Sequence, residues 1–206
     1  MKRILLLALL SLALPISVLA SNSIDFTNSG GTLTGSNSGL SLSGSSLIAV
    51  NGLNGLGLLT GNLGTVTFST GSFLSGDAQH GGSFNAGGSF VVSSNGANGL
   101  PSGNLFNGSF TCSASSPCTW TMTTLANGTH NYTLTGTISG MWYNGTTVAG
   151  TSVQLTINTG KKLFGGTVNI SSGDTNIALV PELGTLGLLG TGLIGVVGLL
   201  RRKVKV

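Results

Sequence analysis

Residues 132–142 read Tyr-Thr-Leu-Thr-Gly-Thr-Ile-Ser-Gly-Met-Trp, so that large apolar side chains alternate with small polar ones. One parity carries Tyr132, Leu134, Ile138 and Trp142, and the other carries Thr133, Thr135, Thr137 and Ser139. Alternation at a period of two is typical of a β-strand that buries one face. The segment therefore predicts a long strand with its apolar face toward a core.

The flanking sequence extends this strand into an antiparallel meander. Asn127-Gly128 and Asn144-Gly145 are strong turn pairs on either side of it. Residues 153–157 alternate again, and Gly160-Lys161-Lys162 predicts a charged turn before a further strand over 163–170. Residues 105–170 are therefore expected to be antiparallel strands joined by short turns.

Residues 21–104 carry the same pattern less regularly. Alternation at 65–68 and 89–92 predicts strands, and three more are expected at 24–27, 40–43 and 47–50. Asn51 to Gly64 is expected to be a long loop with buried leucines. Gly-Ser-Phe recurs from positions 71, 82, 88 and 108, a spacing too irregular for a solenoid, so each copy is interpreted as a strand start after a glycine turn. The fold class is all-β: one antiparallel β-sandwich or jelly-roll-like domain over 21–179.

The charge of the chain is concentrated at its two ends. The formal net charge is +4, with 8 Lys and Arg against 4 Asp and Glu. Within the body only Lys161 and Lys162 oppose Asp25, Asp77 and Asp174, which gives 2 − 3 = −1. The body therefore has no basic surface of the kind that binds nucleic acid.

The N-terminus has the layout of an export signal. Met1-Lys2-Arg3 is a basic start, residues 4–14 are apolar, and Val18-Leu19-Ala20 is a small-x-small cleavage pattern. Residues 1–20 are thus expected to be a signal peptide that the Sec translocon recognises and that is cut after Ala20. An uncleaved anchor is the alternative, although the apolar segment is short for a membrane span.

The C-terminus, residues 180–206, has three parts. Pro181-Glu182 precedes 18 residues without a charge, Leu183 to Leu200, and a basic cluster follows. At about 1.5 Å of rise per residue, a helix over Leu183–Leu200 spans about 27 Å, close to one hydrocarbon core. The basic cluster consists of Arg201, Arg202, Lys203 and Lys205. The apolar segment and the basic cluster together predict a single transmembrane helix in the inner membrane, whose basic end stays in the cytoplasm.

This tail resembles the PEP-CTERM sorting signal, which combines a Pro-Glu-Pro motif, an apolar Gly- and Leu-rich helix and a short Arg-rich end. Pro181 and Glu182 match the first two motif positions, and Leu183 stands where the second proline is expected. The resemblance covers the tail alone. It implies recognition by an exosortase, a membrane-embedded transpeptidase, and a product at the cell surface or outside the cell, associated with exopolysaccharide and biofilm. A plain C-terminal membrane anchor is the alternative.

The two cysteines are expected to pair. Cys112 shares parity with Phe106 and Phe110, and Cys118 shares parity with Trp120, so both thiols fall on an apolar face around a turn at 113–117. Oxidation is the default for exported chains. We therefore expect a Cys112–Cys118 disulfide across a hairpin.

Few residues suggest chemistry. Asp77 and His80 form the local acid–histidine pair of the body, and a turn in which Asp77 caps its own backbone is the ordinary explanation. Asp25 and Asp174 could form a glycosidase pair only if the fold brought them together. No catalytic residue, metal site or cofactor is predicted.

Three functions follow from these features. The first is a non-enzymatic surface or matrix protein sorted by its tail. The second is a carbohydrate-binding module that holds extracellular polysaccharide; Trp120 and Trp142 have core parity, whereas Tyr143 is expected to be exposed at a turn, and a cluster of exposed aromatics around it would favour this function. The third is a secreted hydrolase, which requires Asp77 and His80 to meet another acid in a cleft.

Overall fold

The computed structural model describes residues 23–113 and 115–178. The predicted signal peptide at 1–20 and the predicted tail at 180–206 lie outside the described residues. Two 3₁₀ turns occur in the body, η1 at Leu53–Gly55 and η2 at Ala97–Gly99. The strands are β1 Ser23–Ser29, β2 Thr32–Ser36, β3 Gly39–Asn51, β4 Leu59–Thr70, β5 Phe73–Asp77, β6 Gly81–Phe84, β7 Gly87–Asn95, β8 Ser102–Phe110, β9 Cys118–Thr124, β10 His130–Trp142, β11 Thr147–Asn158, β12 Thr167–Asn169 and β13 Ser172–Ala178.

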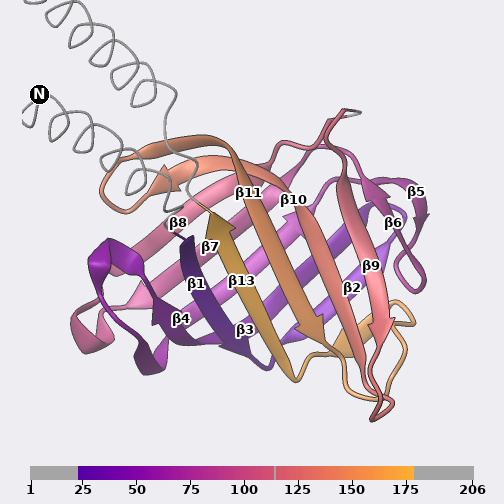
Figure 1. The fold of residues 1–206 in the computed structure, drawn as a ribbon, viewed down its shortest axis with the longest axis horizontal. Helices are drawn as coiled ribbons and strands as arrows, with labels where there is room; N and C mark the ends of the chain where they lie inside the picture. Colours follow the sequence, from indigo (N-terminus) through magenta and orange to yellow (C-terminus); the bar gives the residue numbers. More distant parts are fainter. Residues whose placement is uncertain (1–22, 114, 179–206) are drawn as a thin grey trace, which may run out of the picture. The chain divides into compact units, whose positions relative to one another are not determined.

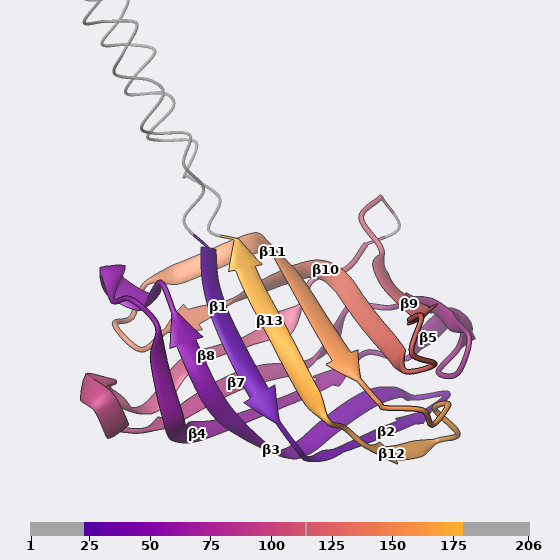
Figure 2. The same cartoon turned by 60° about the horizontal axis from the view of Figure 1, so that its bottom comes forward.

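The predicted all-β antiparallel body is confirmed, and its sandwich-like walls belong to one sheet that closes on itself (Figures 1 and 2). The strand order is β11-β13-β1-β3-β4-β7-β8-β10, and a further pairing between β10 and β11 completes the circuit. β9, β6 and β5 continue beside β10, while β2 and β12 continue beside β3. Closure pairs strands that would otherwise be exposed edges.

The alternation over 132–142 places β10 as predicted. Tyr132, Leu134, Ile138 and Trp142 are buried. In the register with β11, Leu134 lies opposite Leu155 and Tyr132 opposite Ile157, so apolar cross-strand pairs line the inner face. The two predicted turns also form: the amide of Gly128 donates to Leu125 O (2.9 Å), and that of Gly145 donates to Trp142 O (2.9 Å).

Aromatic side chains fill much of the interior. Phe106 lies against Trp142 with ring centroids 4.8 Å apart, and Trp120 stacks on Tyr132 at 5.1 Å. The core side chains come from all parts of the closed sheet, so both walls contribute to a single core. Trp120 and Trp142 are therefore core residues, as their parity predicted.

Three sequence predictions about elements need correction. The strands expected at 40–43 and 47–50 are one strand, β3, interrupted by an irregular register between Leu42 and Ser45. Residues 51–64 are not one long loop, because η1 is followed by β4 from Leu59; Leu53 and Leu63 are buried as expected. The strand expected over 163–170 shrinks to β12, which pairs with β2, since Gly166 at φ 100° interrupts an extended chain there.

The Gly-Ser-Phe copies do not share one structural role. The copies at 71–73 and 88–90 lie where strands begin, but those at 82–84 and 108–110 end β6 and β8. Burial of the phenylalanine is the more general feature: Phe84, Phe90 and Phe110 lie in the core, and Phe73 is partly buried. The tripeptide therefore marks inward-facing phenylalanines rather than strand starts.

Candidate functional site

The body has two distinct ends, set by where the chain enters and leaves it. Ser23 of β1 pairs with Ala178 of β13, so the first and last described residues are neighbours. Asn51, which precedes η1, pairs with Asp25 two residues along β1, so η1 lies at the same end. The η2 turn and the β10–β11 turn lie there too, on the left of Figure 1. We call Ser23, Ala178 and residues 52–58, 96–101 and 143–146 the proximal rim, and the opposite end of the body the distal end.

The proximal rim contains a repeat that sequence reasoning missed. Residues 51–56 read Asn-Gly-Leu-Asn-Gly-Leu and residues 95–100 read Asn-Gly-Ala-Asn-Gly-Leu, so the two segments differ only at Leu53 and Ala97. Both form the same turn, with Asn54 at φ 54° and Asn98 at φ 55°. A comparison of the sequence with itself would have revealed this signal.

Hydrogen bonds join the turns of the proximal rim. The Asn98 side chain donates to Thr60 O (2.7 Å), and the Asn54 side chain donates to the Tyr143 hydroxyl. The amide of Tyr143 donates to Leu105 O (2.9 Å). The Asn54–Tyr143 contact links the β3–β4 turn to the β10–β11 turn, which lie on well-separated strands of the closed sheet.

The distal end contains a recess of about 330 Å³ beside the turn that joins β5 to β6. Its lining consists of Gly35, Ser36, Asn37, Phe73, Asp77, Ala78, Gln79, Phe164, Gly165 and Gly166. Core side chains fix its walls: the Trp120 indole donates to Ala78 O (2.9 Å), and the Tyr132 hydroxyl donates to Gln79 O (3.2 Å). A Cβ at Gly35 would meet the Phe164 ring, so only glycine allows these walls to approach.

A second recess of about 540 Å³ is lined by residues that flank Phe164 to Gly166 of the first recess. These residues are Thr159, Gly160, Lys161, Lys162, Leu163, Thr167, Val168 and Asn169. Lys161 and Lys162 are both exposed, and they belong to the predicted charged turn. The distal end therefore combines two hollows with both lysines of the described body.

Asp77 lines the smaller recess and forms an exposed hydrogen-bonded pair with His80. The His80 ring nitrogen Nδ1 is 3.0 Å from Asp77 Oδ2, and the amides of Gln79 and His80 donate to Asp77 Oδ1 at 2.8 and 2.7 Å. The hydrogen bonds from His80, the ring first and then the amide, hold the pKa of Asp77 below its ordinary value of 3.8. Asp77 thus caps its own turn, which is the ordinary explanation that the sequence suggested.

In the part of the chain that the structure describes, the further acid that a hydrolase would require is not found beside this pair. Within residues 23–113 and 115–178, no group of three or more His, Cys, Asp or Glu side chains is placed to hold a metal ion. Asp25 and Asp174 lie on the adjacent strands β1 and β13, where the register places them on one face, diagonal to each other. Asp25 accepts a hydrogen bond from the Asn176 side chain, and Asp174 accepts one from Thr27 Oγ1 (3.2 Å). Each carboxylate is therefore engaged by a cross-strand partner.

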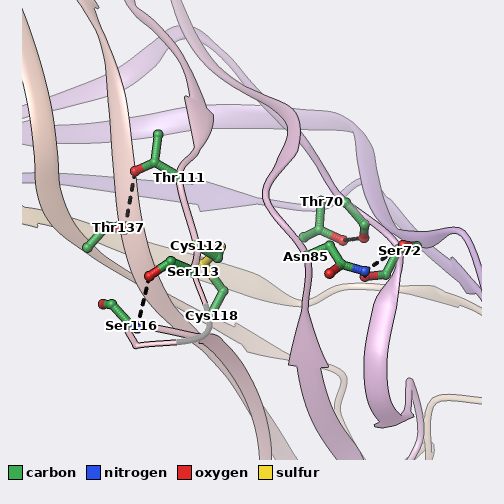
Figure 3. Close-up of a disulfide and its surroundings, with 10 residues drawn as sticks. Thr70, Ser72, Asn85, Thr111, Cys112, Ser113, Ser116, Cys118 and Thr137 are labelled. Carbon is green, nitrogen blue, oxygen red and sulfur yellow. Dashed lines mark hydrogen bonds between the residues drawn. A yellow bond between two sulfur atoms is a disulfide. The ribbon is translucent and has the colours of Figure 1, made fainter.

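Cys112 and Cys118 form the expected disulfide, with Cα atoms 5.2 Å apart (Figure 3). The expected hairpin around it is wrong, because β8 and β9 each pair antiparallel with β10 and not with each other. Backbone hydrogen bonds between Ser113 and Ser116, at 3.0 and 3.1 Å, close the intervening turn. Sequence reasoning missed Gly136, which lies on the inner face of β10 directly against Cys118. A Cβ at this position would collide with Cys118 Sγ, so glycine makes room for the disulfide.

Tyr143 is exposed, as predicted, at 36% of its surface. It is the single exposed aromatic residue among those that the structure describes, so the cluster that would favour a sugar-binding surface there is not present in that part of the chain. The predicted sorting residues lie outside the described residues; these are Pro181, Glu182, Arg201, Arg202, Lys203 and Lys205. Within the described body, no helix has the length and apolar character needed to cross a membrane.

Comparisons with known proteins returned nothing: no protein family, no curated protein and no solved structure matches this chain.

Proposed function

We propose that the chain is an exported, non-enzymatic protein of the cell surface or extracellular matrix. The Sec translocon exports it through residues 1–20, and Leu183–Leu200 holds it temporarily in the inner membrane. An exosortase-like transpeptidase then processes it near Pro181 and Glu182. The released body is associated with extracellular polysaccharide and biofilm.

The observation that carries this proposal is the pairing of Ser23 with Ala178. Both predicted targeting segments join the body at the proximal rim, so both would leave the folded domain on the side that faces the membrane. A body whose ends left from opposite sides would have to span the distance between them. Here the fold can form on the outer side of the membrane while its last residues remain tethered.

The described body suits the space outside the inner membrane. Its disulfide is of the kind that persists in oxidising compartments. Within the described residues, no buried side-chain nitrogen or oxygen lacks a hydrogen-bond partner. Its outer faces rely on Thr, Ser and Asn rather than on charge. These features favour a self-contained domain that folds after export.

A structural role fits the Asp77–His80 pair better than catalysis does. A general acid requires a raised pKa, whereas the pKa of Asp77 is lowered. The pair is also exposed, without the water-excluding walls that strengthen electrostatic catalysis. The two side chains therefore act as a turn cap.

The tail chemistry explains why processing would occur at its motif. Pro181 disfavours a helical conformation at Val180, and the charge of Glu182 resists burial in lipid. Both effects would keep the motif extended at the membrane surface, where a membrane-embedded enzyme can reach it. Arg201 to Lys205 would remain in the cytoplasm.

The test is expression of the wild-type chain and the Glu182→Ala variant in a Gram-negative cell with an active exosortase. Immunoblots of fractionated cells should show a shortened wild-type protein at the surface and a longer Glu182→Ala form in the inner membrane. An Asp174→Ala variant, altered in the body, serves as control and should be processed like the wild type. Identical full-length bands for all three proteins, all in the membrane, would favour a plain anchor.

Binding of extracellular polysaccharide is a second candidate function, favoured by the two recesses at the distal end. That end is remote from the proximal rim and would face away from the membrane. Phe73 offers a partly buried ring, and Asn37, Asp77 and Gln79 offer polar groups of the kind that recognise hydroxyls. Gel retardation by purified exopolysaccharide, reduced by Lys161→Ala together with Phe73→Ala, would support it.

A further inference from the structure

We propose that the proximal rim is a lipid-contacting surface, which rests against the bilayer headgroups while the tail is anchored. This inference rests on the proposed function, because it requires Leu183–Leu200 to be in the membrane. It adds a second attachment of the body to the lipid, made by the folded domain itself.

Apolar side chains project from the proximal rim without contributing to the core. Leu58 is 66% exposed and Leu56 is 41% exposed, whereas Leu53 of the same turn is buried. Tyr143 adds a partly exposed ring with a polar tip, a combination enriched where proteins meet the membrane interface. Exposed apolar loops of this kind are stabilised when they enter the headgroup boundary, because their apolar surface leaves water.

Charge is absent from this surface. None of residues 52–58, 96–101 and 143–146 is Asp, Glu, Lys, Arg or His, and all of them are among the described residues. The nearest carboxylate along the adjoining strand is Asp25, which is hydrogen-bonded to Asn176. Lys161, Lys162 and the Asp77–His80 pair lie at the distal end. The body is therefore polarised, with an uncharged apolar end and a charged end.

Backbone groups of the turn that contains η1 are hydrogen-bonded to one another, which suits a surface that contacts lipid. The amide of Gly52 donates to Leu56 O (3.1 Å), and the amide of Leu56 donates to Leu53 O (2.9 Å). Polar backbone groups without partners are costly in lipid, so internal bonding removes part of that cost. The contact between Asn54 and Tyr143 also holds two separate parts of the proximal rim together.

The length of chain after the body sets the distance to the membrane. Four residues separate Ala178 from Leu183, the first residue of the apolar segment. At about 3.5 Å per residue, this connection reaches at most about 18 Å. A tail in the bilayer would therefore keep the end that carries Ala178 close to the lipid surface. Among possible occupants of the proximal rim, a bilayer is the one that this tether delivers.

The test uses the full chain, purified from the membrane of cells without the processing enzyme and reconstituted in phosphatidylethanolamine–phosphatidylglycerol liposomes. An environment-sensitive fluorophore is attached through Leu58→Cys, with Leu163→Cys as the matched control. Leu163 is also exposed, at 49%, but lines the larger distal recess. The native cysteines are paired and do not compete for the label. Retention of the wild-type thermal unfolding midpoint shows that each variant is folded.

The label at position 58 should emit at shorter wavelength than the label at 163. It should be quenched several-fold more by spin-labelled lipid, and several-fold less by aqueous iodide. Equal accessibility of both labels to iodide in chains that float with the liposomes would overturn the lipid contact and leave the anchoring proposal intact. Shielding from iodide without quenching by lipid would indicate a second copy of the chain and also overturn it. Chains that do not float would overturn both proposals.

Discussion

At the scale of single residues, Gly136 has a role that its place in a strand conceals. It lies between Leu134 and Ile138 on the inner face of β10, where a large side chain would match the alternation. The Cys112–Cys118 bridge occupies that space instead. The disulfide is thus a packed part of the core as well as a covalent link, and its short loop contributes about 2 kcal/mol by chain entropy.

We predict that Gly136→Ala destabilises the oxidised protein by about 1–3 kcal/mol, because the added methyl group overpacks the core against Cys118. Denaturant unfolding measures this loss. Gly165→Ala is the control, since no heavy atom lies within 4 Å of a Cβ built there. Equal stability of the two variants would mean that β10 and β9 can separate at no cost.

The Asp77–His80 pair yields a prediction with a defined sign. The pKa of Asp77 in the folded protein lies below 3.8, so the pair stabilises the fold above that ordinary value. The stabilisation is lost as the pH falls through the lower, folded-state pKa. NMR titration of the side-chain carboxyl should show the lowered midpoint, and His80→Ala should raise it. The His130 ring contacts Thr124, so His130→Ala should leave the midpoint unchanged. A similar rise in both variants would show that the hydrogen bonds from His80 are not the cause of the lowered pKa.

At the scale of elements, alternation was a good guide wherever one face of a strand is buried. It located β10 and β11, and it assigned both tryptophans and both cysteines to the core. It was a poor guide to η1 and η2, because these turns are built from Gly and Asn in left-handed conformations rather than from a periodic pattern. It also predicted a strand over 163–170, since Leu163 and Phe164 look alike in sequence although one is exposed and the other buried.

The repeated turns allow a matched experiment on backbone conformation. Asn98 has φ 55° and donates to Thr60 O at 2.7 Å. Asn98→Gly should lose the hydrogen bond alone, whereas Asn98→Ala should also introduce strain of about 1 kcal/mol in the left-handed region. Thermal or denaturant unfolding of the two variants measures the difference, and the same pair at Asn54 provides an internal repeat. An Asn98→Ala protein as stable as Asn98→Gly would show that the turn relaxes.

At the scale of the whole molecule, closure of the sheet could not be predicted from the sequence. It depends on pairings between distant segments, of which β1 with β13 is the most extreme, joining Ser23 to Ala178. Local alternation predicts which face of a strand is buried, but it does not predict which other strand it pairs with. The recess beside Asp77 was missed for the same reason, because Gly35, Phe73 and Phe164 meet only in the fold.

The pairing of Ser23 with Ala178 gives the described body its polarity. The proximal rim carries both connections to the predicted targeting segments, and the distal end carries the recesses and the lysines. An exported body tethered at the proximal rim would present its distal end to the surroundings.

In the proposed function, export and tail processing deliver an oxidised body to the outside of the cell. Mass spectrometry of the protein extracted from the cell surface tests it most directly. We expect a mature chain that begins at Ser21, contains a disulfide-linked Cys112–Cys118 peptide, and lacks every peptide from Gly184 to Val206. A surface protein that always keeps Gly184 to Val206, in cells with an active exosortase, or a chain found inside the cell with Met1 retained, would contradict it.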